Sequence, residues 1–447
     1  MTNKLNLGNL IRHPLFGFFT SGLGAQSLRS ALIRIVNVGL SLAISILLAR
    51  ILGVDGLGIY AGAMALISLL AVPAMLGVPV GLIQLVSRYL ASNELDHARG
   101  MMQWGVGQVL AGTLVLASAG AIIAISFFWN DITTVTVYLL AFAVLPILGL
   151  TSAQRAILNA FELSSMSITP QDIVRPGFLA AALFAWLIFW PEYRGNAAIA
   201  MSLQLLAFVI ALLAGTLLIR RYGSSVLSHG PRAYDFRRWY RTSIPFMLLA
   251  ASEIVMSQTD IIMLAWWEPP ASAGLYRIAT SAALLINLPA IAIATPLAPA
   301  VARLFQQNNT DELKRTVRLT ARWAFAGCLP IALVLIFGGD WLLGFVFGHE
   351  FIAAHTAVVI LVFAQIFHLA VGPVGVVLEM TGFQHFAAKV LIIGAVANVV
   401  LNAVLIPTFG IVGAAVATAI SIVIWNGLTL YGVFRHLKID PTILGRT

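Results

Sequence analysis

Long apolar stretches recur along almost the whole chain, and short connections rich in glycine, proline and charged residues separate them. Each stretch is about as long as a helix that crosses a bilayer, and runs such as LVLASAGAIIAISFFW (114–129) are apolar on every side. A transmembrane β-strand would instead alternate between apolar and polar positions. The pattern therefore predicts twelve membrane-spanning helices, at 31–52, 57–87, 101–128, 134–158, 173–190, 196–219, 242–267, 272–302, 319–347, 353–380, 388–406 and 411–434.

The composition supports the same interpretation. Sixty per cent of the residues are apolar, only 10% are charged, and the mean hydropathy is +0.95. A soluble domain has about 45–50% apolar and 25% charged residues, so a water-soluble globule is excluded. We therefore expect an all-α polytopic membrane protein of 447 residues. Its one cysteine, Cys328, can form no internal disulfide.

Lysine and arginine are concentrated in the even-numbered connections, whereas the odd-numbered connections carry mainly carboxylates. The basic set is Arg88, Arg99, Arg220, Arg221, Arg232, Arg237, Arg238, Arg241, Lys314, Arg315, Arg318 and Arg322. Short cytoplasmic loops retain an excess of such residues, which places both termini in the cytoplasm. This topology and contact with anionic membrane lipids account for the net charge of +9, so we expect no nucleic-acid partner.

A turn motif occurs twice, and the repeat divides the chain into two equivalent halves. Gly58-Ile59-Tyr60 and Gly274-Leu275-Tyr276 are 216 positions apart, and further matches, such as Arg88 with Arg303, occur at offsets of 215 to 218. Because each half contains an even number of spans, the two six-helix lobes are related by a pseudo-two-fold axis along the membrane normal. Taken singly, the two tyrosines suit interfacial anchoring. The expected segments are an N-terminal cytoplasmic or interfacial segment (1–30), an N-lobe (31–219), a basic linker (220–241), a C-lobe (242–434) and a cytoplasmic tail (435–447).

The two LG…GxY turns, the equivalent halves, Asp260 ahead of the second turn and PTFGIVGAAVATAIS (407–421) together resemble the polysaccharide-transport family. This family holds the Wzx-type flippases of O-antigen and other lipid-linked oligosaccharides, within the multidrug/oligosaccharidyl-lipid/polysaccharide exporter superfamily. The resemblance implies a V-shaped transporter of the bacterial inner membrane that moves an undecaprenyl-diphosphate-linked oligosaccharide to the external leaflet by alternating access. It also implies cooperation with glycosyltransferases, a polysaccharide polymerase and a chain-length regulator.

Polar groups inside the first span share one helical face. Arg34, Asn37, Ser41 and Ser45 follow a 3-4-4 spacing. A cation followed by an amide and hydroxyls suits a diphosphate that trails a sugar, although Arg34 could equally reach the cytoplasmic headgroups. Arg155 and Arg175, near the cytoplasmic corner of the first half, are further candidates for binding the substrate, and local salt bridges with neighbouring carboxylates are the alternative.

Carboxylates inside the second half are candidates for coupling to a proton or a sodium ion. Glu253 and Asp260 share a face of the seventh span, and Glu379 lies near the cytoplasmic end of the tenth, where Lys389 could pair with it. We expect desolvation to make Glu253 the titrating group. Asp260 is expected to pair with Arg277 of the next span, and Arg277 is also a candidate substrate ligand in the central cavity.

Other functional classes fit the sequence less well. The chain has no phosphate-binding loop for ATP, the two histidines of HEFIAAH (349–355) are too far apart to share a helical face, and no metal site or catalytic residue is expected. A cation-coupled multidrug extruder of the same superfamily remains the main alternative, but the first three spans carry no internal acidic residue. A membrane polysaccharide polymerase or ligase would need a large external loop, and the largest expected one, 338–352, is small. We therefore expect a transporter and not an enzyme.

Overall fold

The computed structural model describes residues 22–222 and 230–445, and the regular secondary structure of this part of the chain is all helical, with no strand. Ten of its helices are long and apolar enough to cross a membrane. Residues 1–21 of the expected N-terminal segment and residues 223–229 of the expected linker lie outside the described residues. The prediction of an all-helical, multi-pass membrane protein is therefore confirmed for the described residues.

The described part of the first half contains seven α-helices, with one π-turn and one 3₁₀ turn among them. They are α3 (Gly22–Met75), α4 (Val78–Ala91), α5 (Leu95–Phe127), α6 (Ile132–Ala160), α7 (Ser164–Thr169), the π-turn η1 (Pro170–Val174), α8 (Arg175–Phe189), the 3₁₀ turn η2 (Pro191–Tyr193) and α9 (Ala197–Tyr222).

The second half also consists of helices, and short 3₁₀ turns separate some of them. Its elements are α11 (Phe236–Trp267), α12 (Pro270–Leu284), η3 (Leu285–Asn287), α13 (Leu288–Gln306), α14 (Thr310–Phe337), α15 (Gly339–Val346), η4 (His349–Ala354), α16 (His355–Val371), α17 (Val374–Met380) and α18 (Gln384–Leu437).

Glycines account for the two longest elements, each of which is two helices joined at a bend. Gly53 inside α3 has φ 66° and ψ −170°, and Gly410 inside α18 has φ 53° and ψ −127°. Such angles are strained for any residue with a Cβ, so glycine is the residue that permits these sharp bends. The bends fall at the expected boundaries after residues 52 and 406–410.

Several expected boundaries were wrong, each for a local physical reason. The expected span 57–87 breaks at Leu76 and Gly77, which both have positive φ, and 353–380 breaks at Gly372, directly before Pro373. The segment between the two helices is shorter than the expected linker 220–241. Arg220 and Arg221 belong to the last turn of α9, and α11 already begins at Phe236. The expected loop 338–352 is largely helical, as α15 and η4.

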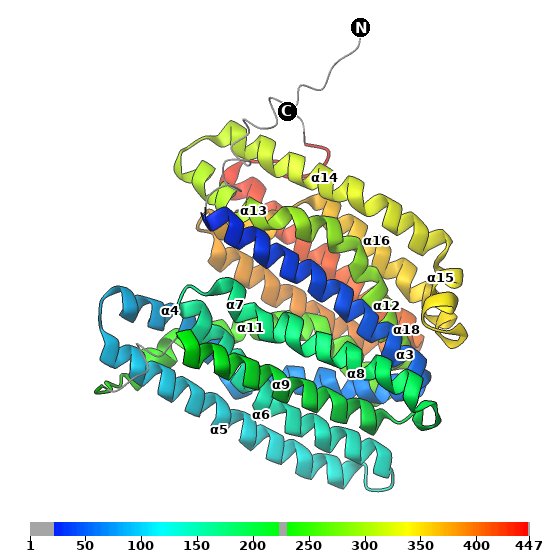
Figure 1. Cartoon of the computed structure of the whole chain (residues 1–447). Coiled ribbons are helices and arrows are strands. Elements are labelled where there is room, and N and C mark those ends of the chain that lie inside the picture. Colours follow the sequence, from blue (N-terminus) through cyan, green and yellow to red (C-terminus); the bar gives the residue numbers. More distant parts are fainter. Residues whose placement is uncertain (1–21, 223–229, 446–447) are drawn as a thin grey trace.

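The helices form two groups that meet along α3, as Figure 1 shows. In the first group α6 packs against α5 and α9, and in the second α18 packs against α11 and α16. The element α3 contacts both groups, since it packs against α6 and α8 as well as α11 and α12. Below, "basic end" denotes the end of the helices at which the arginine-rich connections lie, and "acidic end" the opposite end.

The two repeated turn motifs contact each other at the acidic end. A Cβ added to Gly58 would lie 1.7 Å from the Pro270 carbonyl oxygen, and one added to Gly274 would lie 2.2 Å from the Val54 carbonyl oxygen. Both distances are far inside van der Waals contact, so only glycine allows α3 and α12 to approach so closely.

A second contact between the halves lies at the same end. Arg50 of α3 donates from Nε to the Val346 carbonyl oxygen at 2.8 Å and from Nη2 to the Phe345 carbonyl oxygen at 2.5 Å. These carbonyls belong to the last turn of α15, where a helix leaves its acceptors unpaired and favours a cation. Arg50 therefore caps α15 and ties the first half to the second.

Candidate functional site

A cavity lies between the two groups of helices, and α3, α8, α9, α11 and α12 all contribute to its wall. Its polar lining consists of Ser41, Ser45, Tyr60, Ser68, Arg175, Gln204, Gln258 and Arg277. The Oε1 atom of Gln204 is buried without a hydrogen-bond partner among the described residues. The cavity therefore presents two cations and several uncharged hydrogen-bonding groups.

A second cavity adjoins the first, because Ser68 and Arg175 line both. It extends toward the basic end, where Arg155, Gln171 and Asp172 line it, and α11 adds Glu253. The two cavities together place Arg277, Arg175 and Arg155 along one continuous lining. Among the described ion pairs, Asp172 bonds Arg155, and none involves Arg175 or Arg277.

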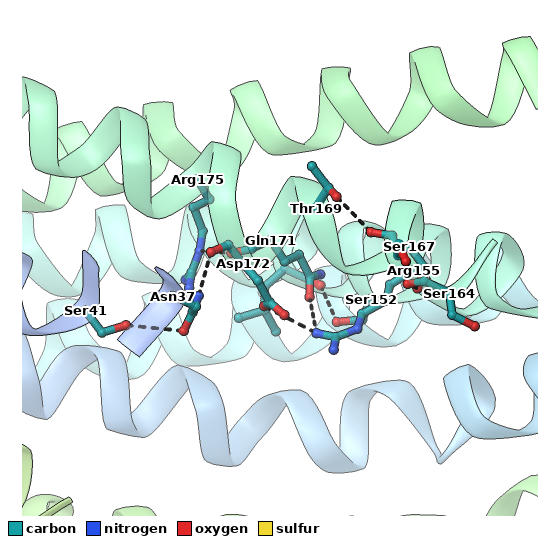
Figure 2. Close-up of polar contacts among 12 residues, drawn as sticks. Asn37, Ser41, Ser152, Arg155, Ser164, Ser167, Thr169, Gln171, Asp172 and Arg175 are labelled. Carbon is teal, nitrogen blue, oxygen red and sulfur yellow. Dashed lines mark hydrogen bonds and ion pairs between the residues drawn. The ribbon is translucent and has the colours of Figure 1, made fainter. Parts of the chain in front are cut away.

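The π-turn η1 organises two of these arginines, as Figure 2 shows. Arg155 Nη1 donates to the side-chain Oε1 of Gln171 at 3.3 Å and lies 3.6 Å from Asp172 Oδ1. Arg175 Nε donates to the backbone oxygen of Gln171 at 3.3 Å, and its guanidinium lies 4.8 Å from the centre of the Phe208 ring. Turns of this kind are rare and occur often at functional sites.

The polar face of the first span divides in the structure. Ser41 and Ser45 line the first cavity, whereas Asn37 Nδ2 donates to the backbone oxygen of Asp172 at 2.8 Å and so contacts the π-turn (Figure 2). Arg34 is exposed and is not among the residues that line either cavity. The shared face expected from the spacing therefore contributes two hydroxyls to the cavity, and its amide bonds a neighbouring helix.

Asp260 does not pair with Arg277, and here the sequence-based expectation was wrong. Asp260 is buried, with 3% exposed, and accepts hydrogen bonds from Tyr276 Oη at 2.6 Å, from Asn402 Nδ2 at 2.5 Å and from Thr418 Oγ1. Arg277 is the next residue after Tyr276 on α12, so it lies on a different face of the helix and lines the cavity.

The pocket around Asp260 contains more oxygen atoms than its hydrogen bonds use. Asn402 Nδ2 also donates to Asn398 Oδ1 at 3.1 Å, but the buried Oδ1 of Asn402 has no hydrogen-bond partner among the described residues. The surrounding side chains come from α11, α12 and α18. A buried carboxylate beside an unpaired amide oxygen is an arrangement that a proton or a hard cation would stabilise.

The other two coupling candidates are exposed, which differs from the expectation that Glu253 is desolvated. Glu253 lines the second cavity, and Glu379 lines a separate pocket near His368 at the break between α16 and α17. The ion pairs found in the described part of the chain do not include one between Glu379 and Lys389. Helical spacing identified the shared face of Glu253 and Asp260 but could not tell which of them the neighbouring helices would cover.

Sequence reasoning missed several residues of the site. Tyr60 and Tyr276 are buried and take part in the cavity and in the Asp260 cluster, so they are not interfacial anchors. Gln171 and Gln204 had no recognisable motif. Pro170 begins the π-turn and Pro176 follows its end, and two prolines six residues apart were a usable signal of an irregular backbone.

Two family models match the sequence of this chain. A family model described as polysaccharide biosynthesis protein matches residues 23–305, which is more than half of the chain. The chain belongs to this family. A second model, MatE, matches residues 245–404. Membership of this family confirms the expectation that the protein is not an enzyme.

A curated relative and two solved structures are similar to the chain. "Probable low-salt glycan biosynthesis flippase Agl15" of Haloferax volcanii is 26% identical over 48% of this chain and 46% of its own length, so the match spans less than half of that relative. The lipid II flippase MurJ in an inward closed conformation superposes with a TM-score of 0.70, at 14% identity, over 90% of this chain and 86% of its own. An inward-facing multidrug resistance MATE transporter gives 0.68 at 14% identity over 91% and 100%. The two structural matches show that the chain shares the fold of these proteins.

Proposed function

We propose that the protein is a flippase that moves an undecaprenyl-diphosphate-linked oligosaccharide, such as the repeat unit of O-antigen or another surface polysaccharide, from the cytoplasmic to the external leaflet by alternating access. The observation that carries the proposal is the row of Arg155, Arg175 and Arg277 along a cavity between the two halves. Guanidinium groups bind phosphate oxygens through paired, charge-assisted hydrogen bonds. The serines and glutamines of the lining suit the hydroxyl groups of a sugar.

The proposed architecture has twelve spans in two six-helix lobes, 31–219 and 242–434, related by a pseudo-two-fold axis along the membrane normal. The contact between the equivalent glycines Gly58 and Gly274 supports it, because equivalent residues meet where such an axis passes. We place the basic end and both termini in the cytoplasm, and the protein in the bacterial inner membrane. Arg34 near the basic end would then meet the substrate first.

Coupling to a proton or a sodium ion is assigned to the carboxylates of the second lobe. The Asp260 cluster has the strongest support, since this carboxylate is buried among hydroxyl and amide groups next to an unpaired oxygen of Asn402. Glu253 and Glu379 would be accessory sites, because both are exposed. Glycosyltransferases, a polymerase and a chain-length regulator are proposed as protein partners from the family resemblance, together with the surrounding membrane lipids.

A cation-coupled multidrug extruder is the second candidate, and the likeness in fold to MATE transporters favours it. The charge of the cavity argues against it. Arg175 and Arg277 form no ion pair among the described residues and would repel an organic cation. The two cavities are lined by three arginines and by two carboxylates, Asp172 and Glu253, and Asp172 is paired with Arg155.

Binding of a defined lipid tests the proposal. Purified protein in nanodiscs would be titrated with undecaprenyl diphosphate and, separately, with the organic cation rhodamine 6G. We expect saturable binding of the diphosphate that R175Q and R277Q each weaken by about tenfold or more, which is the scale of one charge-assisted hydrogen bond. R194Q, a change in the exposed acidic-end connection, should leave binding unchanged. Binding of the cation and not of the diphosphate would contradict the proposal.

A further inference from the structure

The backbone of the fifth span leaves two carbonyl oxygens without their regular helical donors. Arg175 N–H bonds the Pro170 oxygen, five residues back, so it does not reach the Gln171 oxygen as it would in an α-helix. Pro176 has no N–H, so the Asp172 oxygen also lacks its usual donor. Both carbonyls belong to Ser164–Phe189, a segment long and apolar enough to cross a membrane, where an unpaired backbone oxygen is costly.

Side chains supply the two missing donors, and each connects the π-turn to something else. Arg175 Nε donates a hydrogen bond to the Gln171 backbone oxygen, which holds this side chain against its own helix. Asn37 Nδ2 takes the Asp172 oxygen at 2.8 Å, and Asn37 belongs to the first span, 135 residues away in the chain (Figure 2). The Oδ1 atom of Asn37 in turn accepts from Ser41 Oγ at 3.4 Å.

The same turn determines where two arginines of the cavity lie. Gln171 holds Arg155 with its side chain and Arg175 with its backbone, and Asp172 holds Arg155 with its carboxylate. If the turn rewound as an α-helix, Arg175 N–H would bond the Gln171 oxygen and the residues on either side would shift around the helix by about 100° relative to each other. The positions of both guanidinium groups therefore depend on the π-turn.

We propose that Asn37 is a positioning residue that holds the Pro170–Val174 π-turn in the winding that presents Arg155 and Arg175 to the substrate phosphates. In this role Asn37 does not bind the substrate. It donates a hydrogen bond to the Asp172 backbone oxygen, which Pro176 leaves without its helical donor, and so connects the turn that holds the arginines to the first span. A displacement of the first span breaks this bond and releases the turn. The inference rests on the proposed function only for the identity of the ligand.

A pair of substitutions isolates this bond. N37L keeps the approximate size of the side chain and removes the donor. P176A returns an N–H to the fifth span, which can bond the Asp172 oxygen within the helix and makes Asn37 dispensable. The matched control is P330A, which removes a proline from α14 in the other half of the chain. Rescue of N37L by P176A and not by P330A is the signature of the proposed role, because loss of general packing would not be corrected by restoring one N–H.

The first readout needs no ligand. Hydrogen–deuterium exchange in nanodiscs would follow the backbone amides of residues 164–180. We expect N37L to speed exchange there by about tenfold, N37L/P176A to return it to the parent value, and N37L/P330A to leave it fast. Unchanged exchange in N37L would overturn the inference.

The second readout uses farnesyl diphosphate as the probe. We expect N37L to weaken its binding by about tenfold and N37L/P176A to restore it. Faster exchange in N37L with unaltered binding would overturn the inference, since Asn37 would then hold the turn without serving the arginines. Failure of the parent protein itself to bind this probe would count against the proposed diphosphate ligand, and the exchange result would still decide whether Asn37 holds the turn.

Discussion

Asp260 and Arg277 lie on neighbouring helices but have different surroundings, and this separation decides what each can do. Asp260 is enclosed by Tyr276, Asn402 and Thr418, so no large solute in the cavity can reach it. Arg277 lines the cavity and is available to a ligand. An ion pair between them would have cancelled both charges, whereas the observed arrangement keeps an anionic and a cationic function apart.

Removing the charge of Asp260 should therefore affect coupling and leave binding of the diphosphate intact. D260N keeps the shape of the side chain and can still accept from Tyr276. In liposomes, we expect transport by D260N to lose its response to a proton or sodium gradient, while its affinity for undecaprenyl diphosphate stays within about twofold of the parent. E192Q, at an exposed position on η2, is the control. A gradient response that survives in D260N would remove Asp260 from the coupling site.

A carboxylate outside the spans predicts a pH effect on stability. Asp131 precedes α6 and accepts from the backbone N–H groups of Thr133 and Thr134 and from Thr134 Oγ1, and these bonds hold the pKa of its carboxyl below the usual value. Because the folded-state pKa is lowered, this contribution is present above the unfolded pKa of about 3.9 and is lost as pH falls through the folded value.

The D131A variant should accordingly lose about 1 kcal/mol at neutral pH, the usual cost of removing an N-cap, and its Tm should fall by about 2 °C. The difference from the parent should shrink as the pH falls below about 4. Thermal unfolding in detergent across this pH range measures it, and a constant difference at all pH values would show that the charge plays no part.

At the scale of the elements, glycine decides how closely the two halves approach. Gly58 faces the backbone of α12 and Gly274 faces that of α3, and in both cases the obstructing atoms are backbone atoms that cannot rotate away. The contact lies at the acidic end, where Arg50 also caps α15. Alternating access requires contacts of this kind to form and break.

Alanine at either glycine should separate the halves at this end. We expect G58A and G274A to lower the Tm by several degrees, because overpacking a tight helix contact costs about 1–3 kcal/mol. G107A on α5 is the matched control, since nothing lies within 4 Å of its added Cβ and alanine favours a helix. Equal stability of G58A and G107A would show that the close approach is unimportant.

The sequence anticipated these elements unevenly, for reasons that particular residues make clear. Hydropathy located the spans, and glycine marked the bends at Gly53 and Gly410. The repeat identified Gly58 and Gly274 as equivalent, but it could not show that the two turns contact each other. Helical spacing placed Asn37 on the face of Ser41 and Ser45, yet its partner is the backbone oxygen that Pro176, in a distant span, leaves unpaired.

At the scale of the whole molecule, a cavity lined by arginines lies between the two halves, and a buried carboxylate lies within one of them. We propose that the arginines bind the diphosphate and that the first span holds their supporting turn. The glycine contact joins the two halves at the acidic end. A rocking motion of the halves would expose the same cavity to each leaflet in turn. A separate substitution tests each of these features, whereas a transport measurement tests them together.

The most direct measurement is transfer of a lipid-linked sugar between leaflets. The protein would be reconstituted in liposomes with an undecaprenyl-diphosphate-linked oligosaccharide, and the sugar that reaches the opposite leaflet would be counted by enzymatic labelling. We predict transfer by the parent protein and by R194Q, and a loss of about tenfold or more in R175Q and R277Q. Transfer at the same rate in all four proteins, or no transfer by the parent, would contradict the account.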